Sequence, residues 1–219
     1  MVAKIDKIDT QKKGDDRMAP LFKKILYIDV ETTGVEPGKH GIIQLAALMD
    51  IGGEIVDTFN LKCQPHEGAE INPEALKITG TDPEELKTRT TSSDAYREFL
   101  RFLEKHISKF NKEDKAYPAG YNVQFDLQFI EAWFRHHGGN KYGSGSYQNW
   151  KMLDPLPLCR IWDYQGTLAL PDYKLQTVCK HFGIELDAHD ALSDITATRS
   201  LLRMILGVKE ADKGKNLQA

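Results

Sequence analysis

The stretch KILYIDVETTG at residues 24–34 joins an apolar run to two carboxylates and a turn signal. Its apolar residues predict a buried strand over residues 25–30, and the Thr-Thr-Gly sequence after it predicts a turn. Because alternate side chains of a strand point to opposite faces, Asp29 and Glu31 share one face. Two neighbouring acids at the end of a buried strand repel each other, and a divalent cation would remove that penalty. The alternative is that both are ordinary charges at the point where a strand runs out into solvent.

The composition is that of an ordinary soluble globular protein. The chain has 219 residues, 41% of them apolar and 28% charged. No apolar run approaches the roughly 20 residues that cross a bilayer, and the N-terminus lacks the apolar core of a secretory signal. We therefore expect a cytoplasmic protein without a membrane partner. The net charge of −3 means that any surface for nucleic acid must be local. The three cysteines form no metal-like cluster and predict buried thiols: Cys63, Cys159 and Cys179.

Hydrophobic periodicity predicts one α/β domain between two polar ends. We expect a flexible arm at residues 1–20, a domain at 21–207 and a polar tail at 208–219. Strands are expected at residues 25–30, 41–50, 54–63, 116–121 and 151–154, and helices at residues 73–78, 93–107, 123–137, 173–182 and 191–206. The pattern predicts a three-layer fold whose five-stranded mixed sheet, with its first strand central, carries helices on both faces. The Gly- and Ser-rich residues 138–149 predict a mobile loop.

Two further acids lie on apolar faces of predicted helices. Asp126 precedes Phe129, Ile130 and Trp133 at helical spacing, so it shares their buried stripe. Asp194 likewise extends the apolar stripe of the last helix. Each acid is close to a helix N-terminus, where the helix dipole stabilises an anion by a few tenths to about 1 kcal/mol. That dipole effect is the alternative explanation, but it does not account for the inward face.

The residues before the last helix include one histidine of interest. Asp190 predicts the N-cap of this helix, which places His189 in the loop before it. A loop histidine beside acids has a raised pKa and suits a general base. The alternative is a surface histidine without a catalytic role. The pair His136-His137 has no acidic partner pattern and is interpreted as structural.

Three segments in order resemble the motifs of a known enzyme family. They are DVETTG at residues 29–34, NVQFD at residues 122–126 and HDALSD at residues 189–194. Together they resemble the DEDDh subgroup of the DnaQ-like 3′–5′ exonucleases, and the first is most similar to proofreading epsilon subunits of DNA polymerase III. The sequence ALKITG at residues 75–80 also resembles a loop beside that family's active site. The resemblance covers residues 24–206 and implies a ribonuclease H-like fold.

The resemblance also implies a mechanism and a set of site residues. Two Mg2+ or Mn2+ ions would be held by the four carboxylates Asp29, Glu31, Asp126 and Asp194. His189 would accept the proton of the attacking water, with Glu31 as the second catalytic residue, and the product would be a nucleoside 5′-monophosphate. The terminal nucleotide would contact residues that flank these acids: Thr32, Thr33, Gly34, Ile78, Thr79, Asn122 and Phe125. Single-stranded 3′ ends are the implied partner, and a DNA polymerase is a candidate partner.

Several functions remain open from the sequence. Family members act on DNA or RNA, so a proofreading, repair or end-trimming enzyme for DNA competes with an exoribonuclease that trims RNA 3′ ends. Thr32 stands where oligoribonucleases of the family usually have methionine, which argues against that subtype. A catalytically silent ribonuclease H-like binding module is a second alternative, and the presence of all five motif residues argues against it. A nucleic-acid-binding protein that uses residues 1–24 is a third, poorly supported by their mixed charge.

Overall fold

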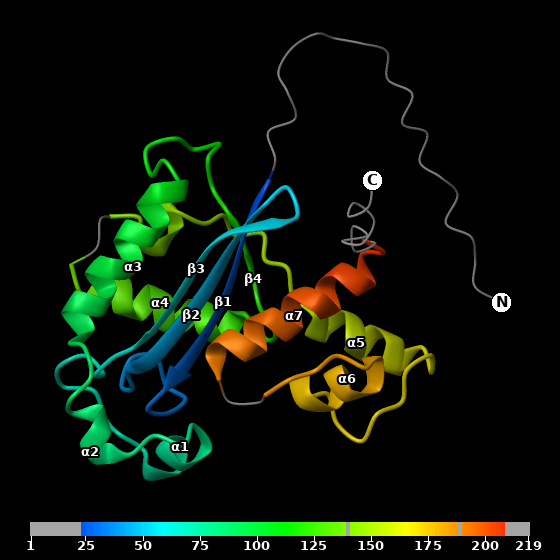
Figure 1. Cartoon of the computed structure of the whole chain (residues 1–219), viewed down its shortest axis with the longest axis horizontal. Coiled ribbons are helices and arrows are strands. Elements are labelled where there is room, and N and C mark those ends of the chain that lie inside the picture. Colours follow the sequence, from blue (N-terminus) through cyan, green and yellow to red (C-terminus); the bar gives the residue numbers. More distant parts are fainter. Residues whose placement is uncertain (1–22, 139–140, 188–189, 209–219) are drawn as a thin grey trace, which may run out of the picture.

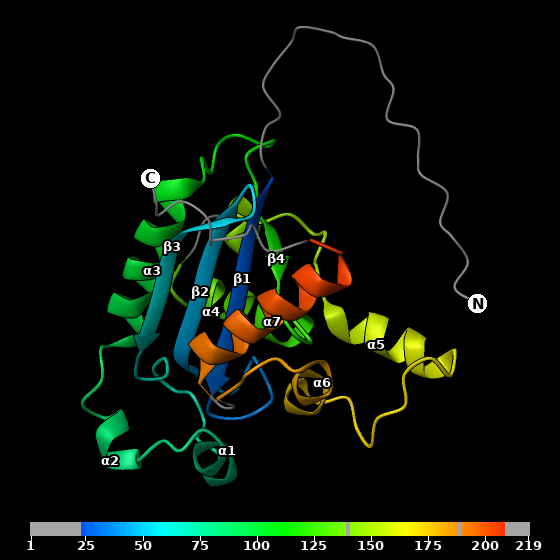
Figure 2. The ribbon, with the colours of Figure 1, turned by 45° about the vertical axis from the view of Figure 1, so that its right-hand side comes forward.

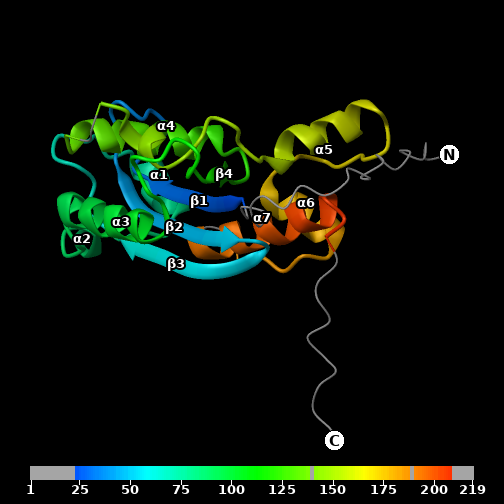
Figure 3. The same cartoon turned by 90° about the horizontal axis from the view of Figure 1, so that it is seen from above.

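A computed structural model describes residues 23–138, 141–187 and 190–208. It consists of one sheet with helices on both faces, as Figures 1 and 3 show. The predicted arm at residues 1–20 and all of the predicted tail except Val208 lie outside the described residues. Within the described ranges, no helix combines the length and apolar character needed to cross a membrane.

The sheet has the strand order β3-β2-β1-β4, so β1 is an interior strand. Its strands are β1 (Lys24–Thr32), β2 (Ile42–Ile51), β3 (Glu54–Lys62) and β4 (Tyr117–Ala119). The predicted meander is confirmed, because β1 pairs antiparallel with β2 and β2 pairs antiparallel with β3. The short β4 pairs parallel with β1, which makes the sheet mixed. In this register Asp29 lies opposite Ala46, and Glu31 lies opposite Gln44.

The prediction of a fifth strand at residues 151–154 is wrong. Leu153 makes only an isolated bridge with Ala119, and the described sheet has four strands. The chain leaves the sheet there because the next residues start a helix. The Asp154 carboxylate accepts the N–H of Leu156 at 2.9 Å, and Pro155 occupies the first helical position.

The helices are α1 (Pro73–Ile78), α2 (Pro83–Leu86), α3 (Ser92–His106), α4 (Gln124–His136), α5 (Pro155–Tyr164), α6 (Leu175–Phe182) and α7 (Ala191–Ile205). Five of them coincide with predicted helices, although α6 begins two residues later than expected. We did not predict α2 and α5. Both begin with an Asp-Pro pair, in which Asp82 or Asp154 caps the helix and proline follows it. The pairs were therefore a usable signal.

Residues 141–149, part of the predicted mobile loop, contain a short 3-10 helix, η1 (Gly143–Ser146). The Ser144 hydroxyl donates to Glu131 Oε2 of α4 at 2.9 Å, and the Ser144 N–H donates to the same oxygen at 3.2 Å. Tyr147 is buried in the core and its hydroxyl donates to Glu104. These residues are therefore packed, through Ser144 on α4 and Tyr147 in the core, whereas the mobility of the loop stays a prediction.

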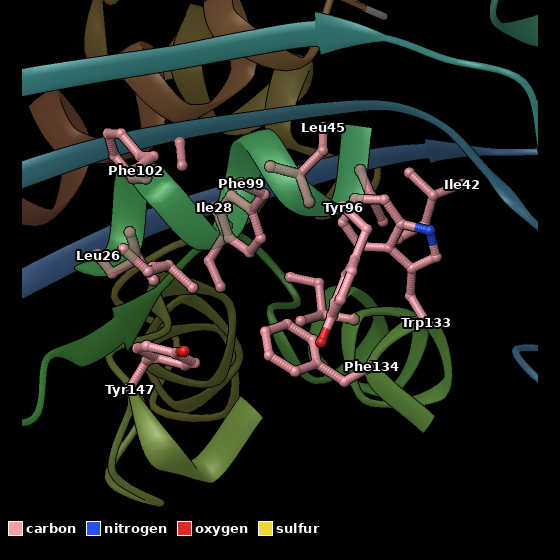
Figure 4. Close-up of a cluster of buried hydrophobic side chains, with 14 of the residues drawn as sticks. Leu26, Ile28, Ile42, Leu45, Tyr96, Phe99, Phe102, Trp133, Phe134 and Tyr147 are labelled. Atoms are coloured by element: carbon pink, nitrogen blue, oxygen red, sulfur yellow. The ribbon is translucent and has the colours of Figure 1, made fainter. Parts of the chain in front are cut away.

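The larger core lies between the sheet and the helices α3 and α4 (Figure 4). It takes Leu26, Ile28 and Val30 from β1. Aromatic rings of the two helices meet edge to face, as Tyr96 does with Trp133 at 5.3 Å between ring centroids. The opposite face of the sheet, which includes Tyr27, packs on α7. The helices α5 and α6 then pack on α7, beside the sheet in Figure 2. The three cysteines are buried, as predicted.

Candidate active site

Three carboxylates meet where β1 ends and α7 begins. Asp29 and Glu31 come from β1, and Asp194 comes from the first turn of α7. Each contributes an oxygen, and these three oxygens lie within 4.8 Å of one another. Figures 1 and 2 show the start of α7 beside the end of β1. The predicted placement of Asp29 and Glu31 on one face is what brings both toward α7.

Asp126 joins this group from the first turn of α4. It is 3% exposed, as its predicted position on the buried stripe of the helix requires. Its Oδ1 accepts the N–H of Val30 at 3.0 Å, which ties the start of α4 to the end of β1. The negative charge of Asp126 acts directly on Asp29. The four predicted metal ligands are therefore brought to one end of the sheet.

Burial and mutual repulsion raise the pKa values of these acids. Burial is the main cause of the raised pKa of Asp29, followed by the charges of Asp126 and Asp194. Burial and then Asp194 raise the pKa of Glu31 to about 7. The pKa of Asp126 is also raised, mainly by burial. Lys62 acts in the opposite direction on Glu31, but too weakly to cancel these effects. The site therefore has an excess of negative charge that a cation would relieve.

The donor set fits a hard divalent cation. Carboxylate oxygens are the ligands that Mg2+ and Mn2+ prefer, whereas zinc sites normally include histidine or cysteine. Oxygens on opposite sides of one Mg2+ lie about 4 Å apart, so a spread of up to 4.8 Å needs only small side-chain movements. Metal binding is the chemistry that this arrangement supports best.

The start of α7 is held in place by Asp190. Its Oδ2 accepts the N–H of Ser193 at 3.1 Å, which confirms the predicted N-cap. Its Oδ1 accepts from Gln44 Nε2 of β2 at 3.1 Å, so the cap also joins the helix to the sheet. Asp190 adds negative charge beside Asp29 and Glu31. The predicted general base His189 lies outside the described residues.

The turn at residues 32–34 is held by its own side chains. The Thr33 hydroxyl donates to Glu70 O at 2.6 Å and accepts the N–H of Gly41 at 2.9 Å. The Thr32 hydroxyl donates to Gly34 O at 2.6 Å. A Cβ on Gly34 would overlap the ring of His40, so only glycine fits there. These hydroxyls therefore shape the turn, and the predicted nucleotide contact would depend on backbone groups.

The other predicted substrate-binding residues divide into two groups. Ile78, which is 61% exposed, lines a groove of about 620 Å3 together with Asn122 and Asp194. Asn122 has a φ of 61°, in the left-handed region that non-glycine residues rarely adopt. In contrast, Phe125 packs on the core with its ring tilted against that of Phe129, and the Thr79 hydroxyl bonds to Thr81.

Asp154 is a site-forming residue that we did not predict. Its two oxygens accept the N–H groups of Asn122 at 3.1 Å and Val123 at 3.2 Å. It therefore holds the strained Asn122 in place while it also caps α5. Its charge contributes to the raised pKa of Asp126. The Asp-Pro pair predicts a helix cap, but no local pattern indicates the contact with a residue 32 positions away.

Comparison with known protein families gives one match that covers most of the chain. The model of the RNase_T family, described as an exonuclease, matches residues 26–202. This range includes all four acids and ends within α7.

Two curated relatives show different coverage. The chain is 32% identical over 194 residues to the PolC-type DNA polymerase III of Halalkalibacterium halodurans, covering 88% of this chain and 12% of that protein. It is 29% identical over 182 residues to the DNA polymerase III subunit epsilon of Aquifex aeolicus, covering 83% of this chain and 79% of that protein. The chain thus spans about an eighth of the length of the PolC-type relative.

Solved structures agree with the fold. E. coli exonuclease I in complex with a dT13 oligonucleotide has a TM-score of 0.68 and 23% identity, covering 84% of this chain and 41% of that chain. The zinc-bound form of an exonuclease I complex with single-stranded DNA has a TM-score of 0.69 and 22% identity. These likenesses confirm the predicted ribonuclease H-like α/β fold, with four strands rather than five in the described sheet.

Proposed function

Because the chain belongs to the RNase_T exonuclease family, we propose that it is a metal-dependent 3′–5′ exonuclease that releases nucleoside 5′-monophosphates from DNA. The observation that carries the proposal is the meeting of Asp29, Glu31 and Asp194, whose oxygens lie within 4.8 Å of one another. Such a cluster lowers stability unless a cation is bound, and a metal-dependent hydrolase has a use for it. DNA is favoured over RNA because relatives at 32% and 29% identity are named for DNA polymerase III.

The four acids would bind two metal ions between them. Asp29, Glu31 and Asp194 would hold a divalent cation, with Asp126 beside them for a second, and we propose Mg2+ or Mn2+ as the ions. The bound ions would supply Lewis-acid stabilisation of the charge that develops on the phosphoryl group. The bond from Asp126 to the Val30 N–H and the cap by Asp190 fix the two helices that carry ligands. The protein thus offers preorganised ligands, so little reorganisation is needed on binding.

Digestion of end-labelled single-stranded DNA, duplex DNA and RNA in parallel would test the proposal. We expect mononucleotide release from the 3′ end of single-stranded DNA with Mg2+ or Mn2+, and none in EDTA. A preference for RNA would support the alternative of an RNA-trimming exoribonuclease. Binding without hydrolysis under all conditions would contradict the proposal and support a silent binding module.

His189 is the predicted general base. In its neutral form it would accept the proton of the attacking water, so turnover should fall at pH values below the pKa of this histidine. His189→Ala should lower single-turnover rates by about 10²–10⁴-fold with little change in metal affinity. A normal rate with a lowered melting temperature would instead indicate a structural histidine.

The partners follow from the same proposal. Single-stranded DNA 3′ ends are the proposed substrate, and a DNA polymerase is a proposed partner because both curated relatives carry polymerase III names. Co-purification with a polymerase, compared with activity of the isolated chain, would separate a proofreading subunit from a free-standing nuclease. The cytoplasmic location stays a prediction.

A further inference from the structure

The groove beside Asp194 has a wall that the motifs do not include. It has a volume of about 620 Å3, within the range of ordinary ligand pockets. One side is formed by Ile78 and Asn122, which flank the acids, and the other by α5 and the segment before α6. That second wall contributes two basic residues, Arg160 and Lys174. Two basic side chains therefore line the same groove as Asp194 of the acidic site.

These two cations have no salt-bridge partner within the part of the chain that the structure describes. Both are exposed. In contrast, Lys77 pairs with Glu74, Lys87 with Glu84, and Arg97 with Asp94. The charges of the groove wall are therefore available to an anion, although acids are frequent elsewhere on the surface.

The wall is supported at several points. The Tyr121 hydroxyl donates to Tyr173 O at 2.6 Å, which joins the segment before α6 to the segment after β4. The Lys174 N–H donates to Asp172 Oδ1 at 3.0 Å. Arg160 lines the same groove as Tyr121 and Tyr173, so all three lie on one surface. The two cations thus stand on a braced surface rather than on a loose loop.

A nucleic-acid strand is negatively charged, so its binding beside these acids is electrostatically unfavourable. Four acids repel its phosphates, and bound metal ions offset that repulsion only at the bond that reacts. The phosphates farther along the strand would remain close to the acids without a counter-charge. Basic side chains outside the metal site are the usual means of binding such phosphates.

We propose that Arg160 and Lys174 bind phosphates of the strand upstream of the scissile bond, and so select a polynucleotide strand over a mononucleotide ester. The proposal rests on the proposed function and names the substrate class of the same site. The guanidinium of Arg160 suits two oxygens of one phosphate, whereas Lys174 supplies a point charge. Both act on binding of the strand and take no part in the bond that breaks.

The test compares two substrates of the same enzyme. A single-stranded oligothymidylate of ten nucleotides carries upstream phosphates, and the p-nitrophenyl ester of thymidine 5′-monophosphate carries none. For Arg160→Ala and Lys174→Ala we expect KM for the oligonucleotide to rise about tenfold each, the size of one charged hydrogen bond. Values of kcat/KM for the ester should stay within about twofold of the parent. Arg160→Lys should recover much of the loss.

Lys180→Ala is the matched control, because Lys180 is an exposed basic residue of α6 that does not line the groove. It should leave both substrates unaffected. Equal losses on both substrates in the groove variants would overturn the proposal in favour of a structural role. Unchanged KM for the oligonucleotide would overturn it outright.

A binding measurement distinguishes failure of the phosphate site from failure of the proposed nuclease function. Fluorescence anisotropy of the labelled oligonucleotide in EDTA needs no hydrolysis. The double variant should bind more weakly, and its dependence of log Kd on log salt should be shallower by about 1.4, or about 0.7 for each lost phosphate contact. If the parent binds in this way but hydrolyses neither substrate, the proposed function fails and the phosphate site stands. If the double variant keeps the affinity and salt dependence of the parent, the phosphate site fails.

Discussion

Two acids on one face of the sheet are packed against the same helix in opposite surroundings. Asp50 of β2 is 2% exposed, and its Oδ2 accepts from Arg199 Nε of α7 at 2.9 Å. Its Oδ1 accepts the N–H of Gly53 at 2.8 Å. Asp29 of β1 instead meets Asp194, five residues earlier on α7.

The difference shows what the first turn and the middle of α7 contribute. At Asp50 the helix supplies a cation, so the buried charge is compensated within the protein. At Asp29 it supplies another acid, so the charge is left for a ligand to compensate. The middle of the helix therefore stabilises the fold, whereas its first turn gives up stability for a binding site. The following changes test this contrast, from the largest expected effect to the smallest.

Asp29→Asn should lower hydrolysis by about 10³-fold or more, because it removes a metal ligand that supports several kcal/mol of transition-state stabilisation. Its melting temperature without metal should stay the same or rise, since one repelling charge is lost. Calorimetric titration with Mn2+ and thermal unfolding in EDTA would measure both effects. Asp50→Asn is the matched control and should lower the melting temperature while keeping activity per folded molecule. Undiminished metal binding in Asp29→Asn would remove Asp29 from the site.

Arg199→Ala should lower the free energy of unfolding by about 3–5 kcal/mol, the usual cost of leaving a buried acid without its partner. Arg199 also donates to Gly53 O at 2.7 Å, so the contact between α7 and the β2–β3 turn weakens too. Urea unfolding at pH 7 would measure the change. The double variant Asp50→Asn/Arg199→Ala should lose less, and an equal loss would mean that packing rather than charge explains the effect.

Stability without metal should fall as pH rises from 4.5 to 7. Glu31 ionises near 4.5 in the unfolded chain and at about 7 in the folded protein, so the folded state binds more protons across this interval. The difference corresponds to at most about 3 kcal/mol, and partial exposure reduces it to about 1–2 kcal/mol. Urea unfolding in EDTA at several pH values would show the fall, which Glu31→Gln should diminish. Added Mg2+ should restore stability at pH 7 and above, where the acids are ready to bind it.

Asp190→Ala should have the smallest effect, a loss of about 1 kcal/mol from the missing helix cap. It also removes the bond to Gln44 and one negative charge near Glu31, so the pKa of Glu31 should fall. Thermal unfolding would measure the first effect, and titration of Glu31 by NMR the second. An unchanged pKa of Glu31 would show that the charge of Asp190 does not contribute to it.

The parts of the fold that could be predicted are those encoded over short distances. Alternation along residues 24–32 placed Asp29 and Glu31 on one face, and helical spacing placed Asp126 on the buried stripe of α4. These patterns depend on the backbone geometry of a few residues, so sequence alone reveals them.

The parts of the structure that were not predicted depend on contacts between residues far apart in the sequence. Residues 151–154 are partly apolar, which suggested a strand. Whether they join the sheet depends on Asp154, whose carboxylate caps α5 and accepts the N–H of Asn122. Residues 141–149 look like a loose loop by composition and are packed because Ser144 reaches Glu131 of α4. The cap that Asp154 forms is encoded locally, but its contact with Asn122 and the contact of Ser144 with Glu131 join residues 13 or more positions apart.

The sequence by itself determined the family resemblance, the three-strand meander and the acids on inward faces, since each is written in neighbouring residues. Only the tertiary structure decided which charges meet. Asp50 pairs with Arg199, which is 149 residues away in the sequence. Asp29 instead lies beside further acids, and Arg160 and Lys174 line one groove with Asp194. The physical reason is that α7 packs on β1 and β2 with one side and on α5 and α6 with the other. Its position therefore decides which acids and cations lie close together.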